Sequence, residues 1–158
     1  VISLNGAVIF LYLGILLAVS LIDWDTQIIY DRFHIFILIL ALAHMWLFPQ
    51  HGILYRLLGM VVISVPMLVL SLVIPGAFGG GDIKLMAVSG FFLGSAPIVC
   101  AMFFGLLTGG GYAAYMLVTG KLDRKAQFAF GPFLSVGLMI AALYGDQIMG
   151  WYVGLLFL

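Results

Sequence analysis

Long apolar runs alternate with short polar breaks along the whole chain. A helix of roughly 20 apolar residues crosses the hydrocarbon core of a bilayer, so each run is expected to form a membrane helix. The breaks contain turn-forming or charged residues, as at residues 49–52 and 75–81. The pattern predicts six helices, at residues 1–22, 33–48, 53–74, 83–93, 97–119 and from about 133 onward, the last interrupted at Gly145-Asp146-Gln147.

Glycine spacing bears on how these helices pack. Gly90 and Gly94 are four residues apart, and so are Gly105 and Gly109. This spacing places two small residues on one helix face and lets a neighbouring backbone approach closely in lipid. The alternative is that glycine is simply frequent in membrane helices.

Composition strengthens the membrane interpretation. Of the 158 residues, 65% are hydrophobic and 8% are charged, whereas a soluble domain is about 45–50% apolar and about 25% charged. We therefore expect an all-α, polytopic membrane protein with about six transmembrane helices, formed by residues 1–158 as a single domain in a lipid bilayer. The formal net charge is zero, which argues against a nucleic-acid partner. Cys100 is the one cysteine of the sequence, so neither a disulfide framework nor a thiolate metal site is expected, and no cofactor is predicted.

The charged loop residues predict an orientation. Basic residues near cytoplasmic helix ends outnumber those on the other side. Six helices place Arg56 alone on one side. The other side, predicted to be cytoplasmic with both termini outside, receives Arg32, Lys84, Lys121, Arg124 and Lys125.

Two acidic positions on that side suggest chemistry. Asp82 follows three glycines and opens an apolar helix, and Asp23 directly follows a nearly apolar run. Asp25 lies two residues further, which on a helix is about 200° away, so only one of the two can face Asp82. We favour Asp23, with Asp25 as the rival. Capping is the alternative role for Asp82. A solvated loop position is the alternative for Asp25 and Asp31, and Asp31 could also cap the second helix.

Paired carboxylates define a possible reaction. In a poorly hydrated site two such groups cannot both ionise easily, so they are expected to share one proton near neutral pH. The ionised group can take a proton from water while the protonated group polarises a peptide carbonyl. This is the chemistry of an aspartyl protease, which requires no metal.

Three sequence blocks resemble a known family. Gly79-Gly80-Gly81-Asp82-Ile83-Lys84-Leu85-Met86 resembles the GxGD segment of bacterial type IV prepilin peptidases and their archaeal relatives. The segment from Ile22 to Asp31 is similar to the family's first acidic block, and Phe130-Gly131-Pro132-Phe133 to a third block. Tyr30 stands where the family usually has proline. Without proline, the turn into the second helix is expected to be less rigid.

The resemblance implies an activity and site residues. It implies a membrane aspartic endopeptidase that removes the leader of prepilin or pseudopilin substrates at the cytoplasmic face of the bacterial inner membrane. Asp23 and Asp82 would be the catalytic pair, and Gly79 and Gly81 would shape the loop before Asp82. Lys84 would lie near the site, or else act only as a positive-inside anchor. Many bacterial members also have an N-terminal part with Cys-x-x-Cys motifs linked to methylation, which this sequence does not match, so no methyltransferase activity is assigned.

Other function classes remain open alternatives. Tyr30-Asp31 matches presenilin-like intramembrane proteases, in which Asp31 would act with Asp82. A transporter or channel could use acidic residues at its cytoplasmic mouth, and a scaffold could use them only as helix caps. His34, His44 and His51 are spread along different faces, so packing or interfacial positions are expected for them rather than a metal site.

Overall fold

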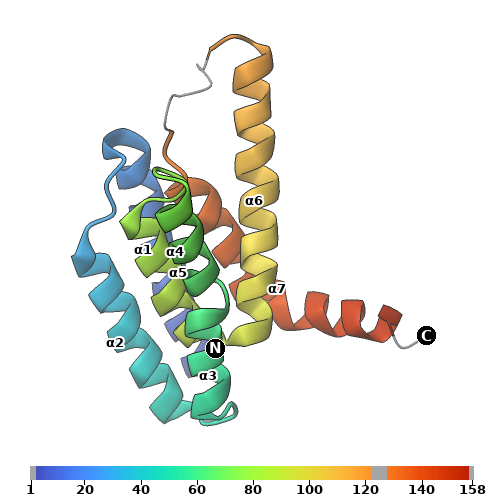
Figure 1. The fold of residues 1–158 in the computed structure, drawn as a ribbon. Helices are drawn as coiled ribbons and strands as arrows, with labels where there is room; N and C mark the ends of the chain where they lie inside the picture. Colours follow the sequence, from blue (N-terminus) through green and yellow to red (C-terminus); the bar gives the residue numbers. More distant parts are fainter. Residues whose placement is uncertain (1–2, 122–127, 157–158) are drawn as a thin grey trace.

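The computed structural model describes residues 3–121 and 128–156, and every described element is helical. The helices form one bundle, and the C-terminal part of α7 projects from it (Figure 1). Their bounds are α1 Leu4–Thr26, α2 Asp31–Leu47, α3 Ile53–Val62, α4 Ser64–Val73, α5 Gly80–Leu93, α6 Ser95–Val118 and α7 Gly131–Leu156.

The α3 and α4 helices together form one membrane-length unit. They are separated only at Ile63, and Pro66 explains the break because it lacks the N–H that would bond four residues back, to the carbonyl of Val62. Counted together, they give the six helical units that the sequence predicts. The all-α fold class is therefore confirmed.

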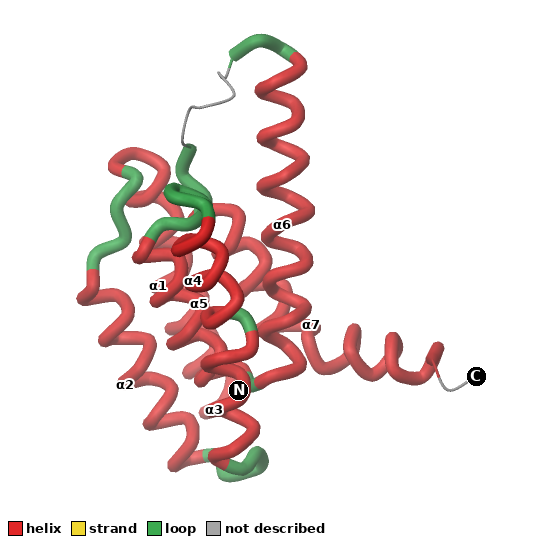
Figure 2. Tube along the Cα trace, viewed as in Figure 1, coloured by secondary structure: helices red, strands yellow, loops and turns green. Residues whose placement is uncertain are grey.

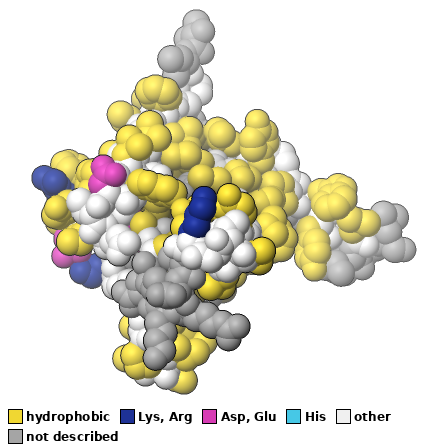
Figure 3. Space-filling model, turned by 90° about the horizontal axis from the view of Figure 1, so that it is seen from above, with side chains coloured by type: hydrophobic (Ala, Val, Ile, Leu, Met, Phe, Trp, Pro, Cys, Tyr) yellow, Lys and Arg dark blue, Asp and Glu magenta, His cyan; other side chains and the backbone are white. Residues whose placement is uncertain are grey.

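Among the described residues, four units are long and apolar enough to cross a bilayer: α1, the joined span Ile53–Val73, α6 and most of α7. Large apolar side chains point outward from these units, as Phe10 and Val118 do at 75% and 88% exposure. Figure 3, which looks onto the top of Figure 1, shows hydrophobic side chains over much of the described surface and charged side chains at a few places. These features define a multi-pass membrane protein, because such a surface is stable in lipid and unfavourable in water.

The end of α1 and the start of α5 differ from the sequence prediction, and both differences affect the site. The α1 helix continues to Thr26, so Asp23 and Asp25 both lie on it, and it ends where Gln27 adopts a left-handed conformation with φ of 55°. The α5 helix begins at Gly80, so Asp82 is its third residue rather than the residue before it.

At the C-terminal side, α7 is continuous through residues 145–147, and the predicted interruption there is wrong. A single glycine weakens a helix by only about 1 kcal/mol, which neighbouring residues can offset. The predicted polar loop at residues 120–129 lies partly outside the described residues, which include neither Arg124 nor Lys125.

The short α5 helix occupies the centre of the bundle. It packs against α2, α3, α6 and α7, and its Leu85, Met86 and Ser89 are fully buried. An added Cβ at Gly90 would lie 2.0 Å from the carbonyl oxygen of Gly59 on α3. The close backbone approach predicted from the glycine spacing is therefore present at Gly90.

Glycines on α6 also allow a neighbouring segment to approach closely. A Cβ at Gly109 would lie 2.5 Å from the ring of Phe130, and one at Gly105 would lie 3.1 Å from Leu134. The start of α7 is thus held tightly against α6. The connections that precede α2, α5 and α7 lie at one end of the bundle, at the top in Figures 1 and 2.

Candidate active site

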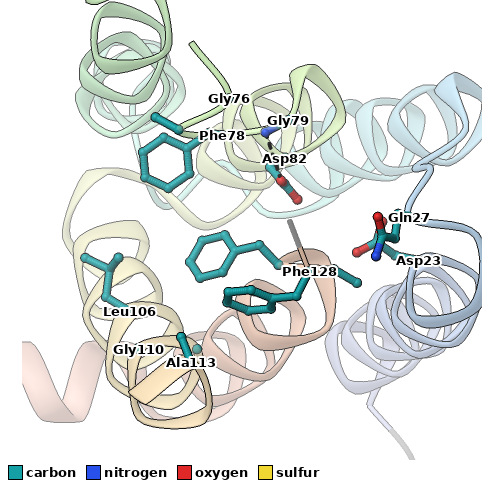
Figure 4. Close-up of a pocket in the computed structure, with 14 residues that line it drawn as sticks. Asp23, Gln27, Gly76, Phe78, Gly79, Asp82, Leu106, Gly110, Ala113 and Phe128 are labelled. Carbon is teal, nitrogen blue, oxygen red and sulfur yellow. Dashed lines mark hydrogen bonds between the residues drawn. The ribbon is translucent and has the colours of Figure 1, made fainter. Parts of the chain in front are cut away.

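A cavity of about 400 Å³ opens at this end of the bundle. It is bounded by the end of α1, the connection before α5, the middle of α6 and residues 128–130 before α7. Asp23 and Asp82 both line the cavity, and their carboxylates point into it from different sides (Figure 4). The chain therefore brings together the two acidic residues that the sequence singled out.

Asp23 is held by the first turn of α7. Its side chain is buried at 4% exposure, and its Oδ2 accepts a hydrogen bond of 3.0 Å from the backbone N–H of Gly131. An added Cβ at Gly131 would lie 2.5 Å from the same oxygen. Glycine at this position thus leaves room for the carboxylate to reach a backbone donor at a helix N-terminus, where anions are favoured.

Asp82 is held within its own segment. Its Oδ2 accepts a hydrogen bond of 3.2 Å from the backbone N–H of Gly79, and the side chain is 8% exposed. The carboxylate therefore caps the N-terminus of α5, as the capping alternative proposed, while it also faces the cavity. Capping and a role in the cavity are compatible.

The three glycines before Asp82 have different surroundings. A Cβ at Gly79 would lie 3.1 Å from Asp82 Oδ2, and one at Gly81 would lie 2.9 Å from the Cβ of Ile29. A Cβ at Gly80 would meet nothing within 4 Å. The first and third glycines are thus confined by the site, and the middle one is not.

The remaining polar candidates lie outside the cavity. Asp25 is exposed and does not line it. Asp31 pairs with Lys84, whose Nζ lies 2.8 Å from Asp31 Oδ1, and both side chains are more than half exposed. A hydrogen bond from Lys84, together with its positive charge, lowers the pKa of the Asp31 carboxyl below its usual value. Lys84 is therefore near the Asp82 segment, but its charge faces Asp31.

His34 is a site residue that the sequence interpretation missed. Packing or an interfacial position was expected, and the ring is indeed buried at 5% exposure. Its Nε2, however, lies 3.0 Å from the carbonyl oxygen of Gly81. The available signal was its position three residues after Asp31, which puts both side chains on one face of α2.

Tyr30, at the turn into α2, has a backbone conformation that proline could also adopt. It is the N-cap of α2, with φ of −72° and ψ of 137°. Proline would fix φ near −65°, within about 15°. The turn therefore keeps a backbone conformation suited to proline without having one, and its lower rigidity stays a prediction.

The described residues contain no group of three or more His, Cys, Asp or Glu side chains placed to hold a metal ion. The fold and the cavity define a multi-pass helical membrane protein in which two aspartates, from helices far apart in the sequence, face one cavity. The chain belongs to the type IV leader peptidase family, whose model matches residues 10–114.

Relatives from several bacteria share this similarity. The chain is 36% identical over 151 residues to the prepilin leader peptidase/N-methyltransferase of Bacillus subtilis (strain 168), covering 96% of this chain and 60% of that protein. Proteins of the same name match from Pseudomonas aeruginosa, at 31% identity over 94% of this chain and 52% of the relative, and from Escherichia coli (strain K12), at 32% over 84% and 60%. The chain thus spans a little over half the length of these relatives. No solved structure gives a significant match to the chain.

Proposed function

We propose that this protein is a membrane aspartic endopeptidase that cleaves the leader peptide of type IV prepilin-like or pseudopilin proteins. Membership of the leader peptidase family and the names of its relatives support the substrate class. The observation that supports the catalytic type is the shared cavity: Asp23 and Asp82 come from helices far apart in sequence and line one space.

Asp23 and Asp82 are the proposed catalytic residues. Each keeps its Oδ2 on a backbone N–H, of Gly131 and Gly79 respectively. Among the described residues no hydrogen bond reaches the Oδ1 of either carboxylate, so these oxygens remain for a water molecule and the substrate. One carboxylate would accept a proton from the water as it attacks, and the other, protonated, would donate to the peptide carbonyl. The shared proton arises because neighbouring carboxylates resist double ionisation.

The proposed orientation places the cavity at the cytoplasmic face of the bacterial inner membrane. Arg32, Lys84 and Lys121 lie at the cavity end of the bundle, and Arg56 lies near the start of α3, which belongs to the opposite end. Positive residues concentrate on the cytoplasmic side of membrane proteins. A leader next to an apolar substrate helix would therefore meet the cavity where that helix leaves the bilayer.

The test uses purified protein in detergent or lipid nanodiscs with a prepilin-like peptide that has a short basic leader. Asp23→Asn and Asp82→Asn are each expected to abolish cleavage while the protein stays folded, and Asp25→Asn, two residues away on the same helix, should retain it. Cleavage by Asp23→Asn but not by Asp25→Asn would assign the catalytic role to Asp25. A wild-type protein that cleaves no such peptide would favour the transporter or scaffold alternatives.

The presenilin-like alternative predicts a different pair, Asp31 and Asp82. Asp31 is bound to Lys84 and does not line the cavity, which disfavours this pairing. Asp31→Asn should therefore keep most of the activity. Complete loss of cleavage in this variant, with Asp23→Asn still active, would support the presenilin-like alternative instead.

A further inference from the structure

The contact between His34 and Gly81 joins α2 to the segment that ends in Asp82. His34 Nε2 lies 3.0 Å from the Gly81 carbonyl oxygen. A carbonyl oxygen can only accept a hydrogen bond, so Nε2 must bear the hydrogen and donate it. The ring is buried, and a buried imidazole N–H without an acceptor is unfavourable. The hydrogen bond to Gly81 therefore favours the one orientation of the ring in which Nε2 faces that carbonyl.

The contact acts on the peptide unit directly before the proposed catalytic residue. Three successive glycines have more backbone freedom than any other tripeptide, so the run does not by itself fix the position of Asp82. At Gly81, residues outside α5 make contact in two ways: Ile29 packs where a Gly81 side chain would be, and His34 binds the Gly81 carbonyl. Of these, only the His34 hydrogen bond is directional.

A second connection between the same helices is weaker. Lys84 Nζ lies 2.8 Å from Asp31 Oδ1, but the two side chains are 58% and 69% exposed. Exposed ion pairs contribute little because water and salt screen them. Asp31 Oδ1 also lies 3.4 Å from His34 Nδ1, so the Asp31 carboxylate faces both cations, Lys84 and, when protonated, His34. Of these polar connections between α2 and α5, the buried His34 contact is therefore the stronger.

We propose that His34 is a positioning residue for the reaction: its Nε2–H holds the Gly81 carbonyl and so keeps the Asp82 carboxylate aimed into the cavity toward Asp23. This role rests on the proposed function of Asp23 and Asp82. Displacing a reacting group by about 1 Å can lower the rate about 100-fold. Losing the contact should therefore lower kcat while KM changes little, because His34 does not line the cavity where substrate binds.

Two amide substitutions at this position differ only in reach. The amide nitrogen of glutamine can occupy the place of Nε2, whereas that of asparagine corresponds to Nδ1 and falls short of Gly81. His34→Gln is expected to keep kcat within about threefold of wild type, and His34→Asn to lose about 10- to 100-fold in kcat, with KM within about threefold for both. A merely structural requirement for a buried polar side chain would affect both variants equally.

Equal activity of the Gln and Asn variants, or an effect confined to KM, would overturn the positioning role. Circular dichroism and gel filtration show whether each variant is folded. A second measurement does not depend on variant activity: the ¹⁵N NMR signals of His34, assigned by their loss in His34→Gln, should show a protonated Nε2. An unprotonated Nε2 would contradict the proposal.

The two proposals fail in different ways. If wild type cleaves the peptide and Asp82→Asn does not, full kcat in His34→Asn removes the positioning role and leaves the proposed function intact. A wild-type protein that cleaves no prepilin-like peptide overturns the proposed function and the positioning role together.

Discussion

Replacing Gly131 with alanine introduces a methyl group at the place that the Asp23 carboxylate needs. The new Cβ would lie 2.5 Å from Asp23 Oδ2, 2.9 Å from its Cγ and 3.1 Å from the Cδ1 of Ile29. Non-bonded carbon contacts are comfortable at about 3.5–4.0 Å, so the carboxylate has to withdraw by roughly 0.5–1 Å. The hydrogen bond from the Gly131 N–H, now 3.0 Å long, would then stretch or break.

The size of the effect follows from that bond. A hydrogen bond to a charged group contributes about 1.5–3 kcal/mol, and each 1.36 kcal/mol of barrier is tenfold in rate. If the bond orients Asp23 for the water, Gly131→Ala should lower kcat about 10- to 100-fold. Initial rates of leader cleavage, measured over a range of substrate concentrations, give kcat and KM separately.

The control is another alanine substitution in the same cavity. Gly110 lines the cavity from α6, and a Cβ there would meet nothing within 4 Å, so Gly110→Ala should cleave at nearly the wild-type rate. Thermal unfolding of both variants distinguishes a local effect from global destabilisation. Wild-type kcat in a folded Gly131→Ala protein would refute the idea that this backbone amide positions Asp23.

Three other outcomes are expected from the structure. Gly90→Ala should destabilise the protein by about 1–3 kcal/mol through overpacking against α3, whereas Gly14→Ala, whose Cβ meets nothing within 4 Å, should not; equal melting temperatures in detergent would contradict this. The cleavage rate should fall on both sides of an optimum pH because the aspartate pair needs one shared proton, and a rate that rises or falls continuously between pH 4 and 9 would exclude this. Because Lys84 lowers the Asp31 pKa, their ion pair stabilises the fold above the ordinary carboxyl range and is lost as pH falls through the lowered value; Lys84→Met should thus lower the melting temperature slightly at pH 7 and not at pH 2, and an equal difference at both would contradict it.

Helical periodicity predicted that Asp23 and Asp25 face different directions, and the place of Asp23 directly after the apolar run favoured it. This difference in direction requires α1 to continue past its apolar run, and α1 does so as far as Thr26. Asp23 then faces the cavity and Asp25 does not. The six helical units were also predictable, because polar breaks separate the apolar runs that form them. Among the described residues, four of these units are long and apolar enough to cross a bilayer.

The contacts of His34 and Gly131 were not predictable in the same way. Both involve a backbone group of a remote segment, the carbonyl of Gly81 and the amide of Gly131 itself. Every residue has such groups, so they leave no pattern of residue types in the sequence. The third sequence block identified the neighbourhood of Gly131, but its hydrogen bond to Asp23 required the packing of α1 against α7.

Because the hydrogen-bond donor for Asp23 is a main-chain amide, ordinary side-chain mutagenesis cannot remove it. Scanning mutagenesis removes side chains and leaves the amide of residue 131 intact, so such a scan would report steric interference there and never the loss of the donor. Replacing the peptide unit with an ester, by incorporating an α-hydroxy acid, deletes that single N–H and adds no bulk. The matched methyl and ester changes at one position would separate crowding of the carboxylate from its orientation.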